Sequence, residues 1–185
     1  MEQEERIINA PNEDKLWQEL ISDFNKNPDQ SDYHVVLEQN ERRVILDICN
    51  NHGVGFEAVE YTSLSAYLYS RNNFRFAIHN QNFKDEVGKF FGMQDIILGF
   101  TEFDGKFIIK TNDENKTALI FADNKVRNTL QSIPDSTFGI VEYTLEDGNG
   151  KVPFLELRIE KAITDLTQLK AIYTAFFKVL VMIEQ

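Results

Sequence analysis

The sequence is poor in the residues from which many functional sites and cross-links are built. Its single cysteine, Cys49, rules out an intramolecular disulfide and cannot supply a paired-cysteine zinc site. It has no Gly-rich phosphate-binding loop, no nucleophile elbow with Ser between glycines, and no loop with the spaced carboxylates that calcium requires. These absences count against the commonest nucleotide-binding, hydrolytic and metal-dependent proteins, and we expect no cofactor and no metal ion.

Basic residues are too few and too scattered to form a nucleic-acid-binding face. The chain has 19 Lys and Arg against 30 Asp and Glu, a net charge of −11. Nucleic-acid binding needs a basic patch, and the nearest approach to one is the pair Arg42-Arg43. The same negative charge disfavours anionic membrane surfaces and favours a basic protein partner. We therefore expect neither nucleic acid nor membrane among the partners.

Long hydrophobic runs are also missing. Residues 1–15 are acidic and contain no apolar stretch, so they predict neither a signal peptide nor a membrane anchor. The most apolar run, 176–183, is interrupted by Lys178 and falls short of the roughly 20 residues that span a bilayer. Together with the lone cysteine, this pattern predicts a reducing, cytoplasmic location.

What the sequence has in abundance is phenylalanine. Phe occurs 15 times and Trp once among 185 residues. Because each ring buries a large area, we expect a core rich in aromatic packing. The length suits one domain with a core of its own. We predict a disordered leader over residues 1–11 and a single domain over residues 12–185.

Hydrophobic spacing predicts an α+β fold. Asn12 is a predicted N-cap, and the apolar residues that follow it have helical spacing. Alternating runs predict about six to seven strands in a mostly antiparallel sheet, with an N-terminal helix, central helices and a long C-terminal helix. The predicted strands are 33–38, 43–48, 56–62, 74–79, 107–111, 138–143 and 154–159. The predicted central helices are 83–91 and a helical region over 113–133, in which 124–133 either continues the first helix or forms a separate one capped by Asp123.

The predicted C-terminal helix is apolar around more than one face. A stripe at i, i+3, i+4 and i+7 spacing includes Tyr173, Phe176, Phe177 and Leu180, and further apolar residues lie off the stripe. Such a helix needs a second cover. A homodimer or a protein partner could provide it, with these four residues as the contact. The alternative is full burial within the monomer.

A cysteine, a histidine and an aspartate lie close together at the end of one predicted strand. Asp47 and Cys49 share a face if the strand alternates, and His52 follows in a Gly-containing loop. A thiolate beside an imidazolium can act as a nucleophile or a redox sensor. These residues are the catalytic candidates. The simpler interpretation is a small buried cysteine and an exposed loop histidine, because nucleophile and base usually come from distant parts of a chain.

Two further groups are weaker. His34 and His79 lie in predicted strands and would hold a metal ion only if they faced each other, with Asp47 as a third ligand. The alternative is a pair of half-buried surface histidines. The second group combines tyrosines with carboxylates, which can form a protein-binding face or an ordinary solvated strand face. Its members are Glu57, Glu60, Tyr61, Tyr67 and Tyr69.

The stretch Glu102–Asp113 contains the pattern Phe-Asp-x-x-Phe-x-Ile-x-Thr-x-Asp, followed by a predicted helix. This pattern resembles that of an uncharacterised bacterial domain family, and the similarity extends over about half of the chain. The resemblance implies that Phe103 and Phe107 are core residues and that Asp113 caps a helix. It implies no chemistry, because the family has no assigned activity.

The sequence therefore favours a non-enzymatic cytoplasmic domain that binds protein through its sheet or its C-terminal helix. A small acidic chaperone of secreted proteins belongs to the same class. The alternative is a thiol-based enzyme or redox sensor that uses Cys49 and His52. A third possibility is a small-molecule pocket lined by phenylalanines.

Overall fold

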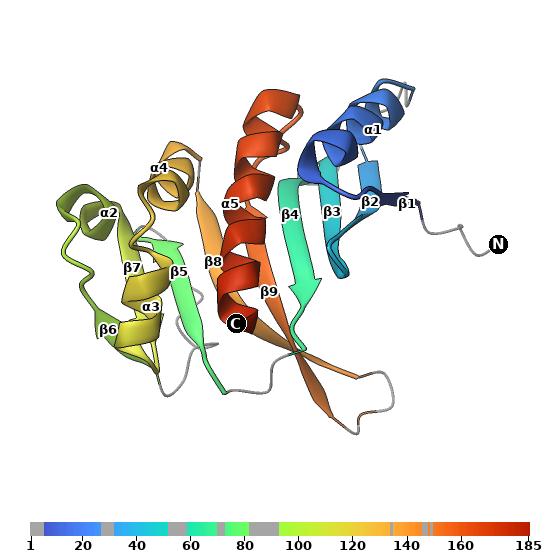
Figure 1. Ribbon diagram of the computed structural model, residues 1–185. Helices are drawn as coiled ribbons and strands as arrows, with labels where there is room; N and C mark the ends of the chain where they lie inside the picture. The colour runs from blue at the N-terminus through green and yellow to red at the C-terminus, as the bar shows by residue number, and fades with distance from the viewer. Residues whose placement is uncertain are drawn as a thin grey trace.

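The computed structural model describes residues 6–26, 32–51, 59–69, 73–81, 93–133, 135–145, 148 and 150–185. Its centre is one nine-stranded sheet with the strand order β1-β2-β3-β4-β9-β8-β5-β7-β6 (Figure 1). The strands are β1 (Ile7–Asn9), β2 (Asp32–Gln39), β3 (Arg42–Asn51), β4 (Val59–Tyr67), β5 (Phe76–Asn80), β6 (Gln94–Ile96), β7 (Phe107–Thr111), β8 (Ser136–Thr144) and β9 (Lys151–Ile159).

The α+β class is confirmed, but the sheet is larger than predicted and is mixed. β1 runs parallel to β2, and the remaining neighbours pair antiparallel. The two strands that the sequence did not predict, β1 and β6, are three-residue edge strands, too short to show alternation. β1 lies within the leader predicted to be disordered. Its Ile8 is buried, which explains why this segment joins the sheet.

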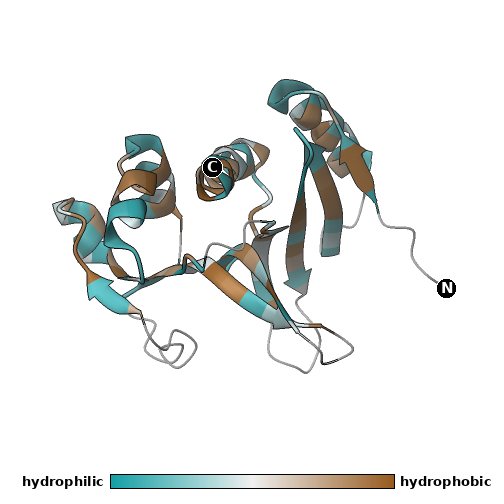
Figure 2. Cartoon of the chain, turned by 60° about the horizontal axis from the view of Figure 1, so that its bottom comes forward, coloured by the Kyte–Doolittle hydropathy of each residue, from teal (hydrophilic) through white to brown (hydrophobic). Residues whose placement is uncertain are grey.

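The helices form a layer on one face of the sheet, as Figures 1 and 2 show. They are α1 (Glu13–Lys26), α2 (Thr101–Lys106), α3 (Glu114–Ile120), α4 (Asn124–Ser132) and α5 (Leu166–Glu184). Several begin at a side-chain cap, which satisfies backbone N–H groups that lack a helical partner. Asn12 accepts from Lys15 N, Asp113 from Lys116 N, Asp123 from Lys125 N and Val126 N, and Asp165 from Gln168 N. The predicted helix 83–91 lies outside the described residues.

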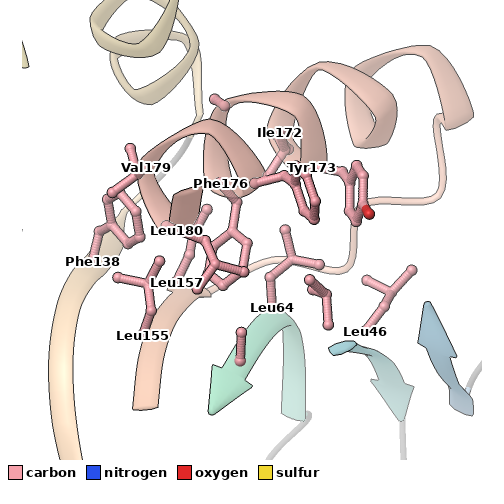
Figure 3. Close-up of a cluster of buried hydrophobic side chains, with 14 of the residues drawn as sticks. Leu46, Leu64, Phe138, Leu155, Leu157, Ile172, Tyr173, Phe176, Val179 and Leu180 are labelled. Carbon is pink, nitrogen blue, oxygen red and sulfur yellow. The ribbon is translucent and has the colours of Figure 1, made fainter. Parts of the chain in front are cut away.

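α5 covers the middle of the sheet. Figure 3 shows its apolar side chains pointing at residues of β3, β4, β8 and β9, among them Leu46, Leu64, Phe138 and Leu157. Within the described part of the chain, α5 is the one helix long and apolar enough to cross a bilayer, and half of that apolar stretch is buried in the protein. A core helix passes the same length and composition test.

The predicted contact residues on α5 lie inside this core. Tyr173, Phe176 and Leu180 are buried, and Phe177 retains 8% of its exposure. The chain's own sheet and helices provide their cover, so burial within the monomer is the arrangement observed. These four side chains are not available to a partner, and the proposed binding surface must be sought elsewhere.

The aromatic core predicted from the phenylalanine content lies beneath α5, α4 and α2. Rings from β5, β8 and the end of α3 pack against one another, with Phe76 and Phe138 perpendicular at 5.5 Å between centroids. Phe103 and Phe107 are both buried, and Asp113 caps α3, as the resemblance implied.

β5 and β8 approach each other unusually closely at Gly139. A Cβ atom built on this glycine would lie 2.5 Å from the carbonyl oxygen of Phe76 and 2.9 Å from the Cα of Ala77. Both are backbone atoms that cannot move aside as a flexible side chain could. Ala77, which lies opposite Gly139, therefore packs directly against the glycine backbone.

Candidate functional site

The candidate site lies on the sheet face opposite the helices, called here the far face. No described helix covers it (Figures 1 and 2). From Tyr61 to Ala66 of β4, half-buried residues alternate with fully buried ones, and β9 follows the same pattern from Phe154 onward. Residues directly opposite on neighbouring strands share a face, so the register arranges the far-face side chains in rows.

One row is polar and charged. From β2 to β8 it runs through His34, Asp47, Ser63, Arg158 and Thr137. His34 Nδ1 and Asp47 Oδ1 are in hydrogen-bond contact. Asp47 stands between His34 and Ser63, so the imidazole does not lie between carboxylate and hydroxyl as a Ser-His-Asp triad requires. The row therefore lacks the order of groups needed for acyl transfer.

Arg158 links this row to Tyr61. Its guanidinium carbon lies 4.2 Å from the centroid of the Tyr61 ring. Partial burial, and then the charge of Asp47, raise the pKa of the Tyr61 hydroxyl above its ordinary value, although Arg158 opposes the shift. Tyr61 is therefore a protonated hydrogen-bonding group at neutral pH.

The structure describes two of the three catalytic candidates, Cys49 and Asp47. Cys49 is a half-buried free thiol whose Sγ lies 3.7 Å from the carbonyl oxygen of Val59. Asp47 shares the far face with it, but Asp47 contacts His34. His52 lies outside the described residues, so the proposed thiolate–imidazolium pair stays a prediction.

The two strand histidines do not face each other. His34 is on β2 and His79 is on β5, five strand steps away in the sheet order. At a strand spacing of about 4.8 Å, the two lie roughly 24 Å apart. Among the described residues, no group of three or more His, Cys, Asp or Glu is arranged to hold a metal ion. The alternative interpretation, a pair of half-buried surface histidines, is wrong for His79, which is 1% exposed, whereas the His34 side chain lies at the surface.

Exposed aromatic rings gather at the end of the far face where β4 ends and β9 begins. Tyr67, Tyr69, Phe154 and Tyr143 form a chain of edge-to-face contacts, called here the aromatic ladder. The centroid distances are 4.8 Å for Tyr69–Tyr67, 5.7 Å for Tyr67–Phe154 and 5.3 Å for Phe154–Tyr143. Tyr69 is 65% exposed, Tyr143 47% and Tyr67 37%.

Backbone pairing fixes the ladder in place. Tyr67 lies opposite Phe154, and Tyr143 lies opposite Val152 in the β8–β9 hairpin. The Tyr143 hydroxyl donates to Glu156 Oε2. Partial burial, and then this carboxylate, raise the pKa of Tyr143 above its ordinary value. The rings are thus ordered before any ligand arrives, which reduces the entropy lost on binding.

A pocket of about 490 Å³, called here the hairpin pocket, adjoins the ladder at Tyr69. Its walls are the β2–β3 turn, the segment that joins β1 to α1, and Tyr69 itself. Asn40 and Glu41 both have positive φ, as the tight two-residue turn between antiparallel strands demands. The lining residues are Asn9, Ala10, Pro11, Glu38, Gln39, Asn40, Glu41, Arg42, Arg43 and Tyr69.

Glu184, at the end of α5, ties the pocket to the rest of the fold. Its carboxylate accepts from Arg42 Nε at 2.7 Å and from the backbone N–H of Tyr69 at 3.3 Å. It therefore holds the β2–β3 hairpin and the segment after β4 in one arrangement. Because Glu184 is almost fully buried, this pairing is screened by solvent less than an exposed pair would be.

The sequence identified part of this site. Tyr67 and Tyr69 belong to the tyrosine–carboxylate group for which the sequence left open a protein-binding face or an ordinary solvated strand face, whereas Glu57 lies outside the described residues. Phe154 and Tyr143 were assigned to predicted strands but not to a surface. The alternation of Phe154, Glu156 and Arg158 would have placed them on one face, but their neighbours across the sheet come from β4, about 90 positions earlier.

The comparisons with known proteins add little. The family models and the curated proteins contain no match to this chain, so the resemblance of the Glu102–Asp113 stretch has no support from a family match. Among solved structures, the mycobacterial trehalose monomycolate transport factor A, TtfA, aligns with a TM-score of 0.49 and 7% identity, over 86% of this chain and 76% of TtfA. A likeness of this degree carries no argument about function.

Buried tyrosines make a prediction about stability in alkali. Burial, and secondarily Asp23 for Tyr33 and Glu13 for Tyr173, raise the pKa of both hydroxyls above the ordinary value near 10. Above pH 10 the unfolded chain loses these protons while the folded chain keeps them. The free energy of unfolding should then fall by up to about 1.4 kcal/mol per pH unit for each group.

Urea unfolding at pH 8, 10 and 11 would measure this fall. Tyr173→Phe removes one of the two groups and should give a shallower pH dependence, although it also leaves Gln39 without the hydrogen bond from Tyr173. Equal slopes for the variant and the natural chain would contradict the assignment.

Proposed function

We propose that this protein is a non-enzymatic protein-binding domain and that the aromatic ladder is its binding surface. The exposure and order of the ladder support the proposal most directly. Tyrosine is enriched where proteins recognise one another, because it offers a large rigid contact area and a polar hydroxyl at a low entropy cost. Three tyrosines and a phenylalanine in contiguous contact form a patch of that composition.

The surroundings of the ladder favour a polypeptide over a small molecule. The ladder lies on the surface at the end of strands and not inside a closed apolar cavity, as small-molecule sites usually do. Leu145 adds a further exposed apolar side chain beside Tyr143 in the same hairpin. The net charge of −11 favours a partner of the opposite sign. A cytoplasmic location and the absence of nucleic acid and membrane from the partners stay predictions.

Selection from a random dodecapeptide library displayed on phage tests this function. Peptides enriched on the natural chain should lose at least tenfold in affinity when Tyr67 and Tyr69 are both changed to Ala, since truncating central aromatic residues usually costs more than about 2 kcal/mol. Circular dichroism would verify that the variant is folded.

A matched control changes an exposed apolar residue that lies elsewhere. Leu119→Ala, on α3, should leave the affinity of the selected peptides unchanged. If selection enriches no peptide, or if every enriched peptide binds the double variant as well as the natural chain, the proposal fails.

A further inference from the structure

We propose that the hairpin pocket binds a Lys or Arg side chain of the partner polypeptide, between the ring of Tyr69 and the carboxylate of Glu41. This inference rests on the proposed function, because the same partner would place apolar side chains on the adjoining ladder. It names the chemistry that the partner must present and the residues that recognise it.

The charges of the pocket leave one carboxylate uncompensated. Arg42 pairs with Glu184 through Nε at 2.7 Å, and Arg43 pairs with Glu38 at 3.0 Å. Both guanidinium groups are therefore already matched by a carboxylate. Glu41, at the tip of the turn, is exposed and has no ion pair with any residue in the described ranges. With Glu184 included, three carboxylates face two guanidinium groups, so the pocket favours a cation.

Hydrogen bonds hold the other carboxylate of the pocket in a fixed orientation. Glu38 Oε2 accepts from Asn9 Nδ2 at 2.8 Å, while its Oε1 faces Arg43. The Arg42 Nη1 group donates to the backbone carbonyl of Asn40 at 3.3 Å. The pocket wall is thus braced on both sides of Glu41, so an entering cation meets a preformed site.

Tyr69 supplies the second half of the recognition. Its ring is 65% exposed, lines the pocket, and is held edge-to-face against Tyr67. A guanidinium or ammonium group over a tyrosine face gains about 0.5–2 kcal/mol, depending on its exposure. A carboxylate at the same site increases the preference for a cation over a neutral group of equal shape. An anion would gain nothing, because Arg42 and Arg43 are already paired.

Continuity with the ladder argues for a peptide cation and not a free small cation. Tyr69 belongs to both surfaces, so a segment whose basic side chain enters the pocket passes directly onto Tyr67 and Phe154. The negative charge of the whole chain would also speed the approach of such a segment at low salt.

The test titrates simple probes into isotope-labelled protein and follows backbone amide shifts by NMR. The probes are N-acetyl-arginine amide, N-acetyl-lysine amide, the neutral isostere N-acetyl-citrulline amide, and N-acetyl-glutamate amide. We expect the two cationic probes to shift the amides of Glu41 and Tyr69 in a saturable manner. The citrulline and glutamate probes should bind at least threefold more weakly.

Two variants locate the site. Glu41→Gln and Tyr69→Ala should each raise the dissociation constant of the arginine probe about three- to tenfold, in line with the worth of a single cation–π or exposed ionic contact. Glu102→Gln removes an exposed carboxylate from α2 and should leave it unchanged.

The outcomes separate this inference from the function it rests on. If the cationic probes shift no amide of the pocket, or bind no more tightly than citrulline, the pocket is not a cation site. If the pocket is not a cation site but the selected peptides still lose affinity for the variant with both Tyr67 and Tyr69 changed to Ala, the protein-binding function stands and only the cation site is rejected. Should the selected peptides carry acidic residues in place of Lys and Arg, the inference is likewise overturned.

Discussion

Replacing Gly139 with Ala is expected to lower the free energy of unfolding by at least about 3 kcal/mol, the upper part of the range for overpacked sites. The added methyl group would lie 2.5 Å from the carbonyl oxygen of Phe76, a separation that real Cβ atoms do not show. β5 would have to move away from β8, which would disturb the pairing of Ala77 with Gly139 and the Phe76–Phe138 ring contact beneath it.

Denaturant unfolding followed by circular dichroism would measure the loss. Gly105→Ala is the matched control, because a Cβ at Gly105 meets nothing within 4 Å and the residue lies in α2. There, Ala should be neutral or stabilise by up to about 1 kcal/mol, as helix propensity predicts. Equal effects at the two glycines would show that the close approach of β5 and β8 is not a feature of the folded protein.

Phe176→Ala is expected to cost about 3–5 kcal/mol, the range for deleting a buried ring from a close-packed core. Phe176 is 1% exposed and contacts Phe138 with 5.9 Å between ring centroids. An ideal interface residue would behave otherwise, because its deletion would weaken association and leave the monomer nearly as stable. The experiment therefore distinguishes burial of α5 within the monomer from burial against another protein.

Unfolding should be measured at two protein concentrations a hundredfold apart. Burial within the monomer predicts a large loss at both concentrations and no dependence on concentration. Leu119→Ala, which truncates a side chain that is 68% exposed, should change the stability by less than about 0.5 kcal/mol. A stability that rises with protein concentration in the natural chain but not in Phe176→Ala would restore the interface interpretation.

Local patterns predicted much of this fold. The caps at Asn12, Asp113 and Asp123 depend on residues near one another in sequence, where cap chemistry operates. The stripe on α5 also correctly indicated a helix that needs cover on more than one side. Periodicity could not say whether that cover was the chain's own sheet or another protein, because both bury the same residues.

The order of strands and the site were beyond the reach of local patterns. β9 pairs with β4, and β5 lies between β8 and β7, so each neighbour is set by packing across long stretches of chain. Tyr67 meets Phe154 only through that pairing. Whether His34 faced His79 could not be decided from the sequence for the same reason, since strand order places β2 and β5 far apart in the sheet. The hairpin pocket likewise depends on Glu184 reaching Arg42 from 142 positions away.

The pairing of β4 with β9 also sets the timing of folding. Leu64 and Leu157 face each other across the centre of the sheet, and α5, which follows β9, supplies the cover for both. During synthesis, α1 emerges first and packs on β2 through the Phe24–Tyr33 contact. The apolar face of β4 stays bare, because β9, which completes its edge, and α5, which covers it, have not yet been made. Pairing β4 with β9 across so long a stretch of chain is slow, and exposed strand edges promote aggregation. We therefore expect nascent chains that stop before residue 151 to recruit chaperones or to aggregate, and refolding of the full chain to be limited by this one long-range closure.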